Sequence, residues 1–193
     1  MGLFYFFKKP VWMGTDLDGA LAAVEKETNQ KKLEKIAKKA FWKEVRVAAV
    51  EKMTNQSALA YLATSTRLGE VDPFVVSAAI KKLTDQNVLA DIAKNNRYDG
   101  YRVDAIQNPN LTDQSVFAYI AKNHPVGGIR YQATCRITDQ SVLAYIAKND
   151  THEWARQAAV YKLTDQSVLA DIAKNDVSRN VRNTAVERLK ELE

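Results

Sequence analysis

The sequence contains a single cysteine, Cys135, and two histidines, His124 and His152, among 193 residues. A single cysteine cannot form an intramolecular disulfide. One thiol and two imidazoles are also too few for the usual zinc sites, and we therefore expect no metal and no other cofactor. A lone reduced cysteine favours a cytoplasmic location. The chain also lacks a glycine-rich phosphate loop, a His-Glu-x-x-His motif and a nucleophile elbow, which argues against an enzyme.

Long apolar runs and a strong charge are also missing. No stretch approaches the roughly 18 apolar residues that a transmembrane helix needs, so we expect a soluble chain with no transmembrane segment. The formal charge of +5 is mild for a dedicated nucleic-acid module. Residues 1–15 are aromatic and basic without the order of a secretory signal. We expect them to cap the end of the fold. The alternative is that they contact a membrane surface or a partner.

Repetition is what the sequence has in abundance. The phrase Thr-Asp-Gln or Thr-Asn-Gln starts at Thr28, Thr54, Thr84, Thr112, Thr138 and Thr164, with gaps of 26, 30, 28, 26 and 26 residues. A unit of this length holds two helices of about ten residues and two tight turns. Because helices this short are marginal alone, each pair must be stabilised by stacking on its neighbours. The sequence predicts a single all-α domain over 16–193, a right-handed α-solenoid of about six helix pairs.

Two sets of polar residues recur with the repeat. An arginine stands eighteen residues after the threonine in most units, and an aspartate follows the threonine in the later ones: Arg46, Arg102, Arg130, Arg156 and Arg182, with Asp85, Asp113, Asp139 and Asp165. The threonine is expected to be the N-cap of the first helix, assisted by this aspartate. Residues alike in every unit serve stacking, so we interpret both sets as structural ion pairs or caps, the alternative being a row that binds phosphate or carboxylate.

The last unit carries a family resemblance. Residues 164–189, which run from Thr-Asp-Gln-Ser-Val-Leu through Asn-Val-Arg to Arg-Leu, resemble the HEAT-like helical repeats of bacteria in a short 26-residue variant. The resemblance covers about 16–193 and implies a HEAT-like solenoid, an arginine–aspartate ladder between neighbouring repeats, and a concave side, lined by the second helices, that binds partners. Ala20 and Val76 replace the arginine, and Asn29 and Asn55 replace the aspartate, so the ladder is in doubt at the N-terminal end.

Positions that vary between units are free to bind a partner. They fall two residues before the arginine, one after it and five after it, on one face of the second helix. Four of these positions hold the aromatic residues Phe74, Tyr131, Trp154 and Tyr161. Exposed aromatic side chains are typical binding anchors. The sequence therefore predicts a peptide or protein groove on this face, unless the rings only fill gaps between stacked helices.

A second variable position lies seven residues after the threonine on the first helices. It holds Lys35, Tyr61, Asp91, Tyr119, Tyr145 and Asp171. We find no common chemistry in this set and expect a solvated outer face. Two enlarged units place insertions at 64–70 and 108–110, which are interpreted as tolerated loops that can also alter the curvature of the stack.

Basic residues concentrate near the start of the repeats. The patch consists of Lys31, Lys35, Lys38, Lys39 and Lys43. We expect a polar end cap for the stack. The alternative is a docking site for an acidic partner, a nucleic-acid backbone or an anionic membrane surface.

Taken together, these patterns favour a non-enzymatic scaffold that binds a protein or peptide. The alternative is a nucleic-acid binder or an enzyme of the alkylpurine DNA glycosylase type, a class that uses a HEAT-like solenoid, with Asp104, Trp154 and Tyr161 in its groove. Nucleic acid is not favoured, because no motif compels these roles. The sequence names neither the partner nor the oligomeric state.

Overall fold

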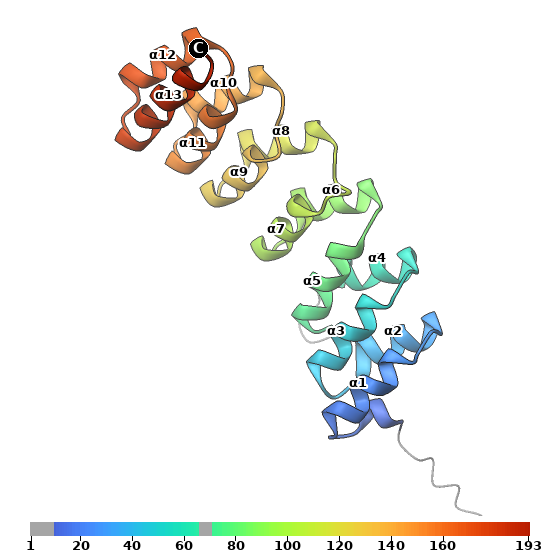
Figure 1. The fold of residues 1–193 in the computed structure, drawn as a ribbon. Coiled ribbons are helices and arrows are strands. Elements are labelled where there is room, and N and C mark those ends of the chain that lie inside the picture. Colours follow the sequence, from blue (N-terminus) through green and yellow to red (C-terminus); the bar gives the residue numbers. More distant parts are fainter. Residues whose placement is uncertain (1–9, 66–70) are drawn as a thin grey trace, which may run out of the picture. The chain divides into compact units, whose positions relative to one another are not determined.

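The computed structural model describes residues 10–65 and 71–193. In these ranges it contains thirteen α-helices, one 3-10 helix and no β-strand, which confirms the predicted all-α fold built from stacked helix pairs (Figure 1). The chain, predicted as a single repeat domain over 16–193, divides into two compact units, Met1–Val88 and Leu89–Glu193, whose boundary falls inside one helix. None of the helices in the described ranges combines the length and apolar content needed to cross a bilayer.

The N-terminal unit contains one unpaired helix and two helix pairs. Its elements are η1 (Val11–Met13), α1 (Leu17–Glu25), α2 (Gln30–Lys39), α3 (Lys43–Glu51), α4 (Gln56–Thr64) and α5 (Pro73–Lys82). Helix α2 packs on α3 and α4 on α5, while α3 lies between α1 and α5. Trp12 of η1 is buried beside α1, so this part of the predicted capping segment covers the helix. Residues 1–9 of that segment and 66–70 of the first insertion lie outside the described ranges.

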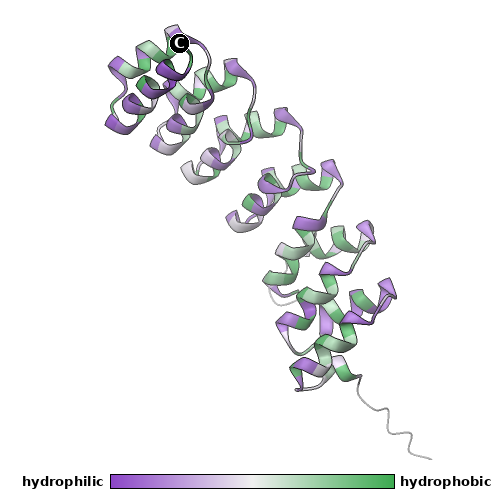
Figure 2. Cartoon of the chain, viewed as in Figure 1, coloured by the Kyte–Doolittle hydropathy of each residue, from purple (hydrophilic) through white to green (hydrophobic). Residues whose placement is uncertain are grey.

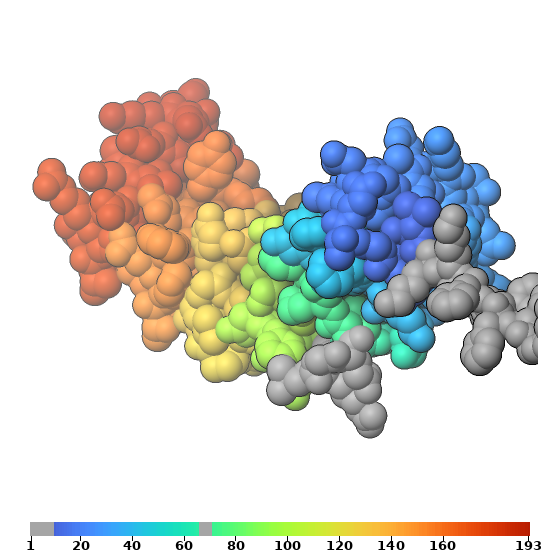
Figure 3. All heavy atoms as spheres, turned by 90° about the horizontal axis from the view of Figure 1, so that it is seen from below, coloured from blue at the N-terminus to red at the C-terminus, as the bar shows by residue number. Residues whose placement is uncertain are grey.

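The C-terminal unit repeats the same arrangement. Its elements are α6 (Gln86–Asn95, which straddles the boundary), α7 (Asp99–Gln107), α8 (Gln114–Asn123), α9 (Gly127–Thr134), α10 (Gln140–Asn149), α11 (Glu153–Lys162), α12 (Gln166–Asn175) and α13 (Arg179–Glu191). The second helices α7, α9, α11 and α13 pack on one another in chain order. Figure 3 shows this part of the chain as successive bands of colour from green to red, as expected of repeats that contact only their neighbours.

The core of each unit is built from the apolar stripes of both helices in a pair. In the pair α10 and α11, Leu143, Ile146 and Ala147 of the first helix and Ala159 and Val160 of the second are almost fully buried. Figure 2 shows hydrophobic residues along the helices and hydrophilic residues gathered at their ends. Because neighbouring pairs share these buried stripes, no pair has a complete core by itself.

The Thr-Asp-Gln phrase caps each first helix through its second residue. Asp113, Asp139 and Asp165 are the N-caps of α8, α10 and α12, and each accepts a hydrogen bond from the N–H of the serine two residues later. The serine hydroxyl also donates to this carboxylate and, with the backbone N–H groups, holds the pKa of each aspartic acid below its ordinary value. The expected threonine cap is therefore wrong by one residue.

The threonine and glutamine of the phrase instead join neighbouring repeats. The Oε1 atom of Gln140 accepts hydrogen bonds from the N–H and the hydroxyl of Thr164, at 3.0 and 3.1 Å, while its Nε2 donates to the carbonyl of Lys162 at 3.2 Å. Gln114 binds Thr138 and the carbonyl of Arg136 in the same way. Each glutamine thus fixes the turn that starts the next repeat.

Replacing Gln140 with alanine is expected to lower the free energy of unfolding by about 1 kcal/mol, because three hydrogen bonds at an exposed site are lost to water. Urea unfolding followed by circular dichroism measures the change. Lys174→Ala, at an exposed position of α12, is the matched control and is expected to change stability by under about 0.5 kcal/mol. Equal midpoints for the two variants would refute the inter-repeat link.

The arginine row forms a ladder, but with different aspartates from those predicted. Arg130 donates from Nε and Nη2 to Asp150 at 2.8 and 2.7 Å, and Arg156 binds Asp176 at 2.8 and 3.0 Å. In the N-terminal unit Arg46 pairs with Asp72, the N-cap of α5, at 2.5 Å. Asp85, Asp113, Asp139 and Asp165 cap the first helices instead. The carboxylate that meets Arg46, Arg130 or Arg156 belongs to the turn between the two helices of the next repeat.

One position of the ladder holds a histidine. Arg102 faces His124, which occupies the place that Asp150 and Asp176 hold in the following repeats. The other ring nitrogen, Nδ1, lies 3.1 Å from the N–H of Val126. Burial, followed by the charge of Arg102, lowers the pKa of His124.

Four of the six residues at the variable position on the first helices have a chemistry in common, because Tyr61, Tyr119, Tyr145 and Asp171 each meet a lysine of the preceding repeat. Lysine Nζ atoms of one repeat lie over the tyrosine rings of the next, at 5.5 Å for Lys94 and Tyr119 and 5.2 Å for Lys122 and Tyr145. Lys148 instead meets the carboxylate of Asp171 at 3.3 Å. An aromatic face and a carboxylate both attract an ammonium group. All six residues are exposed, as expected of a solvated outer face. The expectation of no common chemistry was wrong for these four, because their shared partner lies in the preceding repeat.

Candidate functional site

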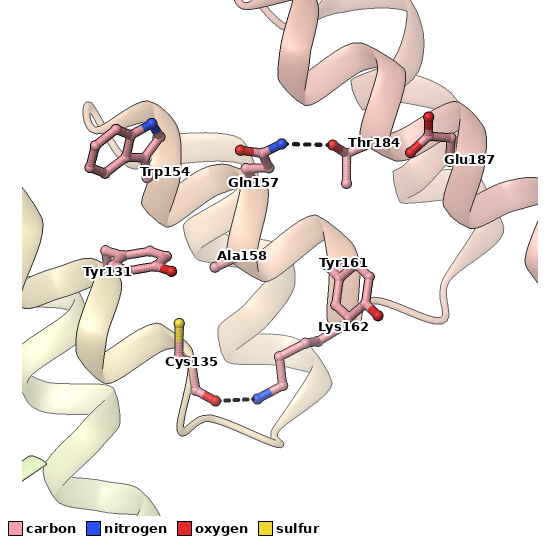
Figure 4. Close-up of a pocket in the computed structure, with 9 residues that line it drawn as sticks. All are labelled: Tyr131, Cys135, Trp154, Gln157, Ala158, Tyr161, Lys162, Thr184 and Glu187. Carbon is pink, nitrogen blue, oxygen red and sulfur yellow. Dashed lines mark hydrogen bonds between the residues drawn. The ribbon is translucent and has the colours of Figure 1, made fainter. Parts of the chain in front are cut away.

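The candidate site is a hollow of about 890 Å³ on the face of the last three second helices (Figure 4). Helices α9, α11 and α13 lie side by side and each contributes residues one or two turns apart. The lining residues are Tyr131, Cys135, Trp154, Gln157, Ala158, Tyr161, Lys162, Thr184 and Glu187. Three of the four aromatic residues predicted to bind a partner are therefore brought together.

Two of the three aromatic side chains of the hollow stand open to solvent rather than filling gaps in the stack, while Tyr131 is half-buried. Trp154 is 61% exposed and Tyr161 is 65% exposed. The rings of Tyr131 and Trp154 meet edge to face, with centroids 6.3 Å apart and planes at 66°. This pair joins α9 to α11 at one end of the hollow and leaves much of the indole uncovered.

The indole of Trp154 is positioned by the residues that precede α11. The His152 ring lies edge-on to it, with centroids 5.7 Å apart and planes at 87°. A Cβ at Gly127 would come within 2.4 Å of the His152 ring, so only glycine at this position leaves room for the imidazole. Packing between consecutive repeats therefore restricts where Trp154 lies.

The remaining lining residues make a mixed polar rim. Gln157 of α11 donates to the hydroxyl of Thr184 of α13 at 3.0 Å. Lys162 donates to the carbonyl of Cys135 at 2.9 Å and to that of Ile137, and burial lowers the pKa of its ammonium group. Cys135 is exposed, and its neighbouring thiol raises the pKa of the Tyr131 phenol. The hollow thus combines aromatic faces with a few hydrogen-bonding groups, as ligand-binding surfaces commonly do.

The fourth predicted aromatic residue, Phe74, lies in the N-terminal unit. It is the second residue of α5 and is 59% exposed. The Nζ atom of Lys43, at the start of α3, lies 4.9 Å from its ring centroid. Phe74 is not among the residues that line the hollow.

The basic patch divides between two helices. Lys31, Lys35 and Lys39 are exposed on α2. Lys38 pairs with Glu34 at 2.6 Å and lies 4.1 Å from the centroid of the Tyr61 ring. Lys43 belongs to α3, where it covers Phe74. Two of the five lysines therefore already have partners within the N-terminal unit.

Asp104, the carboxylate proposed for glycosylase-type chemistry, is on α7 and has its own interactions. The carboxylate in the hollow is instead that of Glu187, on α13. Asp104 is thus not brought together with Trp154 and Tyr161 around this hollow.

Sequence reasoning missed three of the nine lining residues. Ala158 and Thr184 stand two residues after the ladder arginines, at a position that holds Asp104 and Gln132 in earlier repeats. This variation was a usable signal. Lys162 occupies a position that is basic in most units, so its repetition marked it as structural.

A comparison of the chain with protein-family models, with curated proteins and with solved structures finds no match. The resemblance to HEAT-like repeats therefore stays a prediction from the residues, and the geometry of the hollow carries the functional argument.

Proposed function

We propose that the chain is a non-enzymatic scaffold that binds a peptide, or a peptide-like segment of a protein, in the hollow formed by α9, α11 and α13. The observation that carries this proposal is the convergence of Tyr131, Trp154 and Tyr161 around one concave surface. They occupy positions that the repeat leaves free to vary, so stacking does not require aromatic side chains there.

Physical chemistry favours a binding role for such a surface. Tryptophan and tyrosine provide large, rigid contact areas at a small cost in conformational entropy, and they dominate binding hot spots. An indole that is 61% exposed leaves apolar area in water that a ligand can cover. The volume, about 890 Å³, suits a few side chains of an extended peptide.

Selection of random short peptides on the immobilised full chain tests the proposal. We expect the selected peptides to bind the double variant Tyr131→Ala and Trp154→Ala about tenfold more weakly than the original chain, measured by fluorescence polarisation. Trp154→Ala alone, at a mostly exposed position, is expected to weaken binding while leaving the circular dichroism spectrum unchanged.

The matched control is the double variant Tyr119→Ala and Tyr145→Ala, which removes two exposed aromatic residues from the first helices. It is expected to bind the selected peptides as the original chain does. The proposal fails if the two double variants lose equal affinity, or if selection yields no peptide whose binding depends on Trp154.

A further inference from the structure

The two charged side chains that line the hollow differ in what they offer a ligand. The ammonium group of Lys162 donates to two backbone carbonyls, those of Cys135 and Ile137. Glu187 accepts no hydrogen bond and forms no ion pair with any residue in the described ranges. The charge available to a ligand in this hollow is therefore negative.

The hydrogen bonds from Lys162 to backbone carbonyls recur in other repeats and are therefore not specific to the hollow. Arg188, which holds the same position in the next unit, donates to the carbonyl of Leu163 at 3.0 Å, and Arg136 donates to that of Leu111 at 2.8 Å. Each of these cations satisfies carbonyls of the preceding repeat. A ligand anion would have to compete with those bonds for Lys162, whereas a ligand cation has no competitor for Glu187.

The aromatic walls select for the same sign of charge. The faces of Trp154, Tyr131 and Tyr161 carry the negative part of each ring quadrupole, which attracts cations. Elsewhere the chain already uses this interaction, with ammonium groups over the rings of Tyr119 and Tyr145. The aromatic residues of the hollow have no such cation from the described residues beside them.

Resting on the proposed function, we infer that the hollow binds an arginine side chain of the peptide, with its guanidinium against an aromatic face and its N–H groups donating to Glu187. Arginine fits better than lysine, because a planar guanidinium stacks on a ring while its edge donates to a carboxylate. The weakly hydrated guanidinium also loses less on leaving water than an ammonium group does.

The test compares two small probes of the same size, of which only one carries a positive charge. The probes are Nα-acetylarginine methylamide and its citrulline counterpart, in which an uncharged urea replaces the guanidinium. Binding to the full chain is followed by the NMR signal of the Trp154 indole N–H, assigned with Trp154→Phe. We expect the arginine probe to bind about fivefold more tightly than the citrulline probe.

Glu187→Gln is expected to reduce that ratio to about two while retaining the shape of the hollow, because the aromatic faces still favour a cation. The control Asp171→Asn removes a carboxylate from a first helix, where it meets Lys148, and should leave the ratio unchanged. The inference is overturned if both probes bind equally, if neither moves the Trp154 signal, or if Glu187→Gln has no effect. Selected peptides that depend on Trp154 but lack arginine would overturn this inference while supporting the proposed function.

Discussion

Replacing Asp150 with alanine is expected to lower the free energy of unfolding by about 3 kcal/mol, because it leaves a nearly buried guanidinium without its carboxylate. Only 12% of the Arg130 side chain and 4% of the Asp150 side chain are exposed. Asp150 also accepts a hydrogen bond from the N–H of His152, the N-cap residue of α11, so the turn before the helix loses a hydrogen bond as well. Burial opposes ionisation of Asp150, but the hydrogen bonds from Arg130 and His152 outweigh it and lower its pKa.

Asp171→Ala is the matched control for this prediction. Asp171 also pairs with a cation of the preceding repeat, but the two side chains are 44% and 50% exposed, so the loss is expected to stay under about 1 kcal/mol. Urea unfolding of both variants gives the comparison. Similar losses would mean that the Arg130–Asp150 pair contributes no more than a solvent-exposed ion pair.

A double variant separates the cost of an unpaired charge from the value of the pair. Arg130→Met with Asp150→Leu removes both charges, and we expect it to be more stable than Asp150→Ala, because replacing both partners of a buried pair with apolar side chains is often neutral. If the double variant is the less stable one, the bonds from Arg130 to the carbonyls of His124 and Pro125 matter more than the ion pair.

The helix pairs and most of the hollow could be predicted from the sequence because a repeat supplies its own internal comparison. Positions that recur from unit to unit serve stacking or helix capping, and positions that vary are released from both. Six of the nine residues that line the hollow, among them Trp154 and Glu187, came from the variable set. Periodicity also gave the start of the first helix of a repeat to within one residue.

The sequence did not predict which residues of neighbouring repeats pair with one another, because the recurrence of a residue does not identify the residue that it contacts. The sequence predicted Asp139 and its equivalents as the ladder carboxylates, whereas the position of Asp150 holds an aspartate again at Asp176 but a histidine at His124. The choice depends on the backbone: Asp139 caps α10, whereas Asp150 lies in the turn before α11, within reach of the preceding repeat. The Lys148–Asp171 and Lys122–Tyr145 pairs were missed for a related reason. A carboxylate and an aromatic ring are different residue types, and only the contacts show that both attract a lysine ammonium group.

The histidine of the ladder provides the second large effect, since His124→Asp is expected to raise the free energy of unfolding at neutral pH by about 2 kcal/mol. Both ring nitrogens of His124 face donors, the guanidinium of Arg102 and the N–H of Val126. A neutral imidazole has only one acceptor nitrogen, so one donor meets an N–H group. A carboxylate accepts from both, as Asp150 does from Arg130 and His152.

The same substitution is expected to remove an acid sensitivity of the original chain. Burial and Arg102 lower the pKa of His124, so the unfolded chain takes up a proton near pH 6.5 while the folded chain resists it. The contribution of His124 is therefore fully present above about pH 6.5, and stability falls as the pH drops from there toward the lowered pKa of the folded state. Urea midpoints measured across this range should decline for the original chain and stay level for His124→Asp until carboxylates begin to protonate near pH 4.

His124→Asn, which removes the titrating ring but offers only one oxygen, should abolish the decline with a smaller gain in stability. A flat profile for the original chain, or a loss of stability in His124→Asp at neutral pH, would show that the imidazole is already well matched to Arg102.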